Sequence, residues 1–340
     1  MAEVLTSRDI HVDEWADFVA AHPSGHFFQT PQAFEVWQAT DLCHPVALFA
    51  IGPNGITGLI SSVIVAEYTG LRGSLSARCI VWGGPLVAGG DTATAGLLIE
   101  ALSRSVRGMA VYTEFRNLFA QNHIERAFSD NSYIYHPHLN IRINLQQSFE
   151  KLSLSIHPSR LGNWRKALRK GLEIRELESW RDIEEGYRLV YETYRRVRVP
   201  TPHISLFRAH YDLLIPGRDV RFVGAFREGL MIGFRLSLIG GGVMYDYYAG
   251  SDLRHSNIYP NDALILHLLE AGCSDDSLKT FDFGGAGKPG IPYGVRDHKL
   301  KFGGELVEYG RYRRINRHLV YRLSVAGYSL WRLTGRIFKR

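Results

Sequence analysis

KTFDFGGAGKPG, the stretch from Lys279 to Gly290, is the part of the sequence that decides the fold. A short apolar strand ends in Asp282 and a run of glycines, and the chain beyond this loop supplies two further lysines, Lys299 and Lys301. Glycines alone are typical of a turn between two sheet strands. An acid and lysines gathered around such a turn indicate the wall of an active site.

Two nucleotide-binding motifs are excluded at this loop. The segment Gly285–Gly290 matches GxGxxG, but Pro289 and Pro292 forbid the helix that would have to follow it. Asp282 stands where a P-loop needs its first glycine, and Pro289 replaces the residue that would hold magnesium. The sequence also has no HExxH and no GxSxG, so we expect no metal and no α/β-hydrolase chemistry.

The totals indicate a globular protein with two domains. At 340 residues the chain is longer than one core usually grows, and 45% of its residues are apolar. Met1–Phe18 carries five acids and no apolar core, so it is not a signal peptide, and no run approaches the roughly 20 apolar residues of a membrane span. Three widely spaced cysteines suit reduced thiols, so we expect a cytoplasmic protein.

The two halves of the chain share a pattern. A strand pair with Gly52-Pro53-Asn54-Gly55 at its turn precedes helix and strand signals, and a similar strand pair surrounds Arg227-Glu228-Gly229 in the second half. Chance resemblance of two hairpins is the alternative. We predict two copies of one αβ domain with mixed sheets, over residues 1–150 and 151–315, followed by a terminal helix over 316–340.

Two segments are strongly basic. The helix predicted from Arg160 to Gly171 carries five basic residues, which form either a solvated surface or a grip on a diphosphate. From Arg311 onward there are nine basic residues and no acid, while the remaining 31 basic residues and 34 acids leave a charge of −3. The 316–340 helix has an apolar stripe, so it either packs on its own domain or lies on an anionic membrane; we favour the membrane.

Several motifs together resemble the Fem family of peptidoglycan bridge-forming aminoacyltransferases. They occur in the family's order from residue 22 to about 310: His22-Pro23-x-Gly25-x-x-Phe28-Gln29-Thr30, Trp82-Gly83-Gly84-Pro85, Glu114-Phe115-Arg116-Asn117, the Arg160–Gly171 helix, Tyr259-Pro260-Asn261, Phe281-Asp282-Phe283-Gly284-Gly285 and Lys299-x-x-Phe302-Gly303-Gly304. No single motif is diagnostic, but the set is fairly specific.

The resemblance implies two tandem GNAT-like domains and the transfer of an amino acid from aminoacyl-tRNA to a stem-peptide amine. The acceptor would be lipid II or a UDP-linked muropeptide, and no cofactor beyond the aminoacyl-tRNA donor is implied. It also implies that Lys299 serves the acyl-transfer step, although His298 stands where the family often has Phe. Asp282 would either orient the amine or cap its turn.

Substrate-binding residues are carried over by motif. Those expected to hold phosphates and peptide are Arg160, Arg165, Lys166, Tyr245, Tyr247, Tyr248 and Lys301. On a regular strand Tyr245 and Tyr247 share one face and Tyr248 points to the other, so not all three tyrosines can line one pocket.

Two other functions stay open from the sequence. An acyl-CoA-dependent N-acyltransferase of the same fold would carry [QR]xxGx[GA] at a strand-to-helix turn, and Ser105–Ala110 is only a poor copy. A non-catalytic module that binds membrane or RNA would use the basic tail and the Arg160–Lys170 helix instead.

Overall fold

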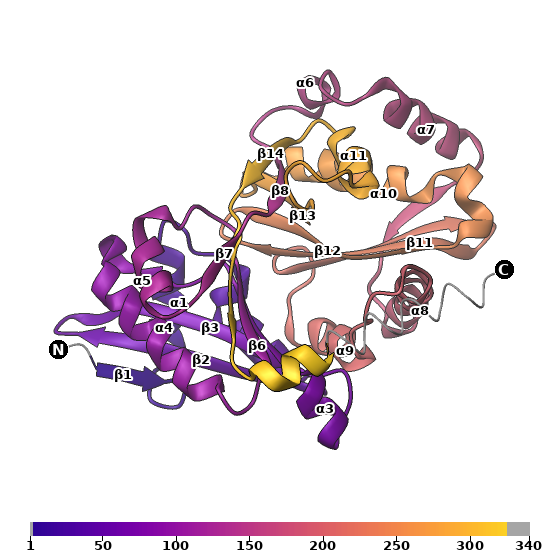
Figure 1. Cartoon of the computed structure of the whole chain (residues 1–340). Coiled ribbons are helices and arrows are strands. Elements are labelled where there is room, and N and C mark those ends of the chain that lie inside the picture. Colours follow the sequence, from indigo (N-terminus) through magenta and orange to yellow (C-terminus); the bar gives the residue numbers. More distant parts are fainter. Residues whose placement is uncertain (1–2, 325–340) are drawn as a thin grey trace. The chain divides into compact units, whose positions relative to one another are not determined.

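The structure, a computed structural model, describes residues 3–324 and divides into two compact units (Figure 1). The first unit comprises the chain up to His136 and resumes at Gly310, and the second is Pro137–Tyr309. No helix within residues 3–324 has the length and apolar character needed to cross a membrane.

The first unit is built on an eight-stranded sheet with the order β1-β2-β3-β4-β6-β15-β7, and β5 pairs with β3. Its strands are β1 (Glu3–Thr6), β2 (Cys43–Gly52), β3 (Gly55–Val65), β4 (Arg78–Trp82), β5 (Leu86–Val87), β6 (Tyr112–Arg116), β7 (Ile134–His136) and β15 (Arg311–Ile315). Its helices are α1 (Val12–Ala21), α2 (Pro31–Gln38), α3 (Gly70–Ser76), α4 (Thr92–Val106) and α5 (Glu125–Asp130).

Local sequence signals explain several of these elements. The hairpin predicted at Gly52–Gly55 joins β2 to β3, and Gly55 has the positive φ of +108° that such a turn requires. The helix α4 begins where Asp91 accepts hydrogen bonds from the backbone of Ala93 and Thr94. Its buried residues recur at helical spacing, as in Ala95, Leu98, Ile99, Leu102 and Val106, and they form the core against the sheet.

The second unit is built on a seven-stranded sheet with the order β14-β8-β13-β12-β11-β10-β9. Its strands are β8 (Leu139–Asn144), β9 (Glu173–Glu176), β10 (Val220–Arg227), β11 (Leu230–Gly240), β12 (Val243–Ser251), β13 (Thr280–Gly285) and β14 (Glu305–Glu308). Its helices are α6 (Phe149–Ser153), α7 (Pro158–Arg169), α8 (Trp180–Val197), α9 (Ile204–Leu213), α10 (Pro260–Cys273) and α11 (Gly294–Leu300), with the 3₁₀ segment η4 (Leu253–Ile258) before α10.

Helices cover both faces of this second sheet. The helix α10 lies on one face and α8 on the other (Figure 1). Ala263, Leu264, Leu268 and Leu269 of α10 are fully buried in the main core cluster of the unit. On the opposite face, α8 approaches so closely that Gly250 of β12 lies against the α8 backbone at Leu189 and Val190.

The two sheets repeat one pattern of strand directions. From β1 to β7 and from β9 to β14, neighbouring strands pair antiparallel three times, parallel once and antiparallel twice. The parallel pair is β4–β6 in the first sheet and β12–β13 in the second. The two units are therefore copies of one topology, as the repeated sequence pattern suggested.

In each sheet one strand is inserted away from its neighbour in the sequence, where the chain passes from one unit to the other. The strand β8 follows β7 directly but inserts between β13 and β14, and β15 follows β14 but inserts between β6 and β7. Both inserted strands place an arginine opposite a buried acid: Arg142 pairs with Asp282, and Arg313 pairs with Glu114. The two units therefore share, besides their topology, a buried acid that faces an arginine on the inserted strand.

This exchange corrects the expected boundaries at 150/151 and 315/316. The chain enters the second unit already at Pro137, because β8 belongs to the second sheet, and it returns to the first at Gly310. Of the predicted helix over 316–340, residues 318–324 are helical, and 325–340 lie outside the described residues.

The close approach at Gly250 makes a testable prediction. A Cβ at this position would lie 2.3 Å from the backbone nitrogen of Val190, so Gly250→Ala must push α8 away from β12. We expect Gly250→Ala to destabilise the protein by roughly 1–3 kcal/mol. The measurement is the urea midpoint of unfolding.

Gly162 is the matched control for this substitution. It lies inside α7, and an added Cβ would meet no atom within 4 Å beyond its chain neighbours and the backbone of its own helix, so Gly162→Ala should stabilise by up to about 1 kcal/mol. A Gly250→Ala protein with an unchanged midpoint would contradict the close packing of α8 on β12.

Candidate active site

The two central parallel strands of the second sheet separate at the candidate site. The strands β12 and β13 pair only at Val243–Thr280, Met244–Phe281 and Tyr245–Asp282, although both continue beyond these residues. The equivalent strands β4 and β6 stay paired over five residues, to Trp82–Arg116. Backbone groups beyond Tyr245 and Asp282 therefore do not pair between β12 and β13, and they need other partners.

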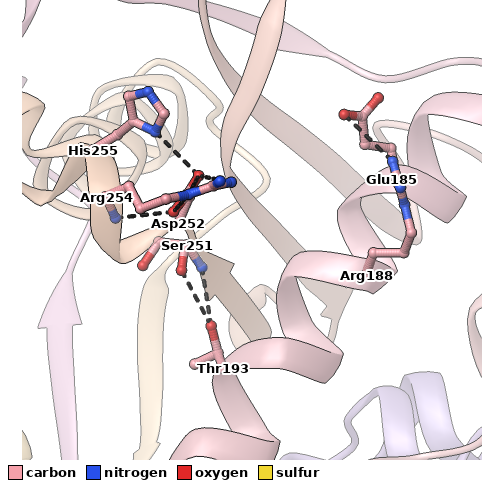
Figure 2. Close-up of polar contacts among 7 residues, drawn as sticks. All are labelled: Glu185, Arg188, Thr193, Ser251, Asp252, Arg254 and His255. Atoms are coloured by element: carbon pink, nitrogen blue, oxygen red, sulfur yellow. Dashed lines mark hydrogen bonds and ion pairs between the residues drawn. The ribbon is translucent and has the colours of Figure 1, made fainter.

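The end of β12 is anchored to α8 (Figure 2). The Thr193 hydroxyl lies 3.2 Å from the Ser251 backbone nitrogen, which donates to it, and 3.4 Å from the Ser251 carbonyl oxygen. The next residue, Asp252, accepts hydrogen bonds from the Arg254 guanidinium and lies 3.1 Å from His255 Nδ1. The Arg254 contacts lower the Asp252 pKa to about 2. These contacts fix the loop between β12 and α10.

Lys299 occupies the place where the two strands diverge. Its Nζ donates a 2.6 Å hydrogen bond to the Phe283 carbonyl and lies 5.6 Å from the centre of the Phe283 ring. Burial lowers the pKa of Lys299, and the nearby charge of Arg235 lowers it further, whereas Asp246 and Asp282 oppose the shift. The structure thus places the predicted lysine at the opening of the sheet, among three charged side chains that act on it.

Arg235 and Asp246 form a buried ion pair on the neighbouring strands β11 and β12. Their side chains are 6% and 8% exposed, and Arg235 Nη1 contacts Asp246 Oδ1. A buried pair of this kind costs desolvation energy, and breaking it would leave one charge uncompensated. Sequence reasoning missed both residues, although a charged residue inside the apolar strand Leu230–Gly240 was the available signal.

Asp282 caps its own turn. It is 1% exposed, and its Oδ1 accepts a 2.7 Å hydrogen bond from the Gly284 backbone nitrogen. Burial raises the Asp282 pKa, while that hydrogen bond and the charges of Arg142 and Lys299 oppose the rise. Of the two roles expected for Asp282, turn capping is therefore present, and its charge also acts on Lys299.

The expected phosphate-binding residues separate in the structure. Arg160 already forms an ion pair with Asp262, at 2.7 Å from Nη1 to Oδ2, and His298 Nε2 lies 3.7 Å from the other oxygen of Asp262. This contact ties α7 and α10 to α11, which carries His298 and Lys299. Burial lowers the His298 pKa, and Asp262 opposes that shift.

The other three basic residues do not join this cluster of direct contacts. Lys166 lies 5.3 Å from the centre of the Tyr259 ring, at the start of α10. Arg165 is exposed on α7, and Lys301 is exposed at the end of α11. Within the described chain, the structure thus brings only Arg160 of the predicted basic set into the ion pairs beside Lys299.

The start of α10 differs from its counterpart in the first unit. Tyr259 precedes α10 with a positive φ of 59°, and no side chain caps the helix, whereas Asp91 caps α4. Uncapped N–H groups at a helix start attract anions. Lys166 stands beside this helix start.

The tyrosine arrangement differs from the expected alternation. A bulge lies between Leu236 and Ser237, so Tyr245 pairs with Leu238 and Tyr248 with Leu236. Because Leu236 and Leu238 share a face of β11, Tyr245 and Tyr248 share a face as well, which corrects the prediction. Tyr247 and Tyr248 have ring centres 4.5 Å apart, and they lie 5.8 Å from His210 and 5.4 Å from Phe207 respectively, both on α9.

Two motifs of the first unit pack together. Buried Gln29 donates to the Ser61 and Trp82 carbonyls and accepts from the Ser61 backbone nitrogen, while His26 Nε2 lies 2.7 Å from the Gly83 carbonyl oxygen. Burial lowers the His26 pKa to about 4, so its ring is neutral. These residues hold the loop after β4, which gives them a structural role.

Comparison with known proteins identifies the topology. Residues 159–299 match the model of the acetyltransferase (GNAT) domain. The crystal structure of FemX has a TM-score of 0.72 and 14% identity, over 94% of this chain and 99% of that chain. The tandem GNAT protein from the clavulanic acid biosynthesis pathway has a TM-score of 0.57 and 11% identity, over 93% and 99%.

L-PGS from Bacillus licheniformis has a TM-score of 0.56 and 15% identity, over 95% of this chain and 96% of that chain. The chain has a tandem GNAT fold. The domain match confirms the predicted acyltransferase class, and the resemblance to the Fem family extends to the fold. No curated protein matches the sequence significantly.

The charges around Lys299 make a prediction for this GNAT fold. The amine reacts with acetic anhydride only when neutral, so the pH midpoint of Lys299 labelling reports its pKa. We expect a midpoint below the ordinary lysine value of about 10.4. Asp246→Asn should lower it further, because the ammonium loses a stabilising charge while Arg235 remains. Labelling is measured by peptide mass spectrometry.

Urea-unfolded protein supplies the reference midpoint, and Asp276→Asn, an exposed change in the same unit, is the matched control. A higher midpoint in Asp246→Asn than in wild type would reject the role assigned to Asp246.

Proposed function

We propose that the protein transfers an amino acid from aminoacyl-tRNA to the stem-peptide amine of a peptidoglycan precursor. The observation that carries this proposal is the position of Lys299. It belongs to the element Lys299-x-x-Phe302-Gly303-Gly304 that resembles the Fem family, and its ammonium sits where β12 and β13 diverge, in a fold similar to FemX.

The chemistry needs modest assistance. An aminoacyl ester is already activated, so the acceptor amine attacks its carbonyl carbon, the amide C–N bond forms, and the ester C–O bond breaks. The amine's proton passes to the leaving ribose oxygen, directly or through solvent. Charge develops on the carbonyl oxygen during attack, and the Lys299 ammonium is the group placed to stabilise it.

The surrounding residues position that ammonium. The Phe283 carbonyl accepts one of its three N–H donors, which leaves the others for the reacting carbonyl. Asp246 and Asp282 favour the charged amine, so this environment offsets part of the burial cost. Arg160 and Asp262 hold His298, the residue before Lys299 on α11.

Anionic substrates suit the start of α10. Its N–H groups have no side-chain cap, and Lys166 lies beside them. Lipid II and UDP-linked muropeptides both carry a diphosphate, and tRNA carries phosphodiesters. We therefore assign the uncapped helix start and the basic helix α7 to the phosphates of a substrate, with the reaction at the inner face of the membrane.

A transfer assay tests the proposal. Labelled amino acids on total bacterial tRNA are offered with lipid-linked and UDP-linked precursors, and acetyl-CoA serves as a competing donor. We expect RNase-sensitive label on a precursor. Lys299→Ala should reduce the rate by roughly 10²–10³-fold, the usual cost of removing one donor to a developing oxyanion.

Arg181→Ala is the matched control, because Arg181 is an exposed cation on α8 of the same unit, and it should keep the wild-type rate. Label that comes only from acetyl-CoA would replace this function by an acyl-CoA-dependent N-acyltransferase. Full activity in Lys299→Ala would reject the role given to the lysine.

A further inference from the structure

A polar cavity lies in the second unit, and the proposed reaction does not use it. It has a volume of about 790 Å³ and lies at the end of the second sheet where β13 begins and β8 ends, beside α6. The polar residues on its wall include Arg142, Lys151, Lys279, Asn144, Gln146 and Glu305. Three cations therefore face one acid, Glu305.

The two lysines of the cavity are available for a ligand. Lys151 lies on α6 and Lys279 immediately precedes β13, and both are exposed. Within residues 3–324 neither side chain takes part in a hydrogen bond or an ion pair. They approach one cavity from two different elements, so their charges converge without any acid bound to them.

Arg142 supplies a fixed charge on the same wall. Its guanidinium donates to the Tyr309 hydroxyl at 2.8 Å and to the Thr280 hydroxyl at 3.3 Å, so both hydrogen-bond partners are neutral. Its Nε is buried without a hydrogen bond, and Asp282 Oδ2 is 3.9 Å away. The arginine charge is thus held rigidly at the wall and only partly offset.

A cavity in the first unit provides a contrast. It has a volume of about 670 Å³ and is lined by Glu100, Arg126 and Asp130 among others, and Arg126 lies 3.6 Å from Asp130. Its single cation is therefore paired, and acids outnumber cations. Of these two cavities, only the one beside α6 has an excess of positive charge.

We propose that the cavity formed by α6, β8 and the start of β13 binds a phosphate-bearing ligand through Lys151, Lys279 and Arg142. Three cations on separate elements suit a group with several negative charges, since lysines act as point charges and the arginine as a planar fork. The amide side chains of Asn144 and Gln146 add neutral hydrogen-bonding groups at the same wall.

The site is close to Lys299 along the strand. Thr280 on the cavity wall and Phe283, whose carbonyl holds Lys299, are three residues apart on β13, or roughly 10 Å. The phosphate could belong to an RNA backbone or to a nucleoside diphosphate. Both sources present the same chemistry to the three cations, and they are distinguished by experiment.

Binding of two probes, measured over a series of salt concentrations, tests the proposal. Fluorescence anisotropy follows a labelled single-stranded RNA, and calorimetry follows UDP. Lys151→Gln/Lys279→Gln is compared with the matched double variant Arg72→Gln/Arg107→Gln, which removes two exposed cations of the first unit. For RNA, log K falls as log salt rises. We expect this dependence to be shallower by about 2 in slope in the cavity variant, about 1 for each lysine removed, and to stay unchanged in the control.

Loss of RNA binding in the cavity variant assigns the phosphate to an RNA backbone, and loss of UDP binding alone assigns it to a nucleoside diphosphate. Wild-type protein that binds neither probe, or a cavity variant that behaves like the control with both, overturns the proposal. Neither probe carries an amino acid or an acceptor amine, so a failed transfer assay with intact binding would reject the proposed function and leave this site standing.

Discussion

The hydrogen bond from Lys299 to the Phe283 carbonyl is the interaction on which the candidate site depends. It exists because β12 and β13 stop pairing after Tyr245 and Asp282, which leaves backbone groups of β13 without partners from β12. A buried carbonyl needs a donor, and α11 supplies an ammonium. The same position sets the chemistry of the lysine. Burial lowers the Lys299 pKa, whereas the negative charges of Asp246 and Asp282 favour its protonated form.

The two units share one topology but differ at this point. In the first sheet β4 and β6 stay paired to Trp82–Arg116, and the acid equivalent to Asp282 is Glu114, which is surrounded by Arg116, Arg311 and Arg313. Although burial works against ionisation, these arginines lower the Glu114 pKa to about 2. The first unit therefore keeps a closed sheet, and the strand separation that positions a lysine occurs in the second.

Much of the fold and part of the site could be predicted from the sequence. The Gly52–Gly55 turn, the position of β13 and the repeat of two αβ units follow from local signals. Local periodicity does not predict that the chain enters the second unit at Pro137 and returns to the first at Gly310. That passage depends on strand pairing between segments that are distant in the sequence. The bulge at Tyr247 was missed for the same reason: one extra residue reverses the face of every side chain beyond it.

The sequence by itself determined the αβ repeat, the glycine-rich loop without a nucleotide-binding motif, and Lys299 as the candidate lysine. Only the tertiary structure decided what surrounds that lysine. Arg235 pairs with Asp246, Arg160 pairs with Asp262, and Arg142 lies between Asp282 and the cavity beside α6. The physical reason is that a charge acquires its pKa and its partners from neighbours distant in sequence. Those neighbours are set by packing and strand register, which residue types alone do not specify.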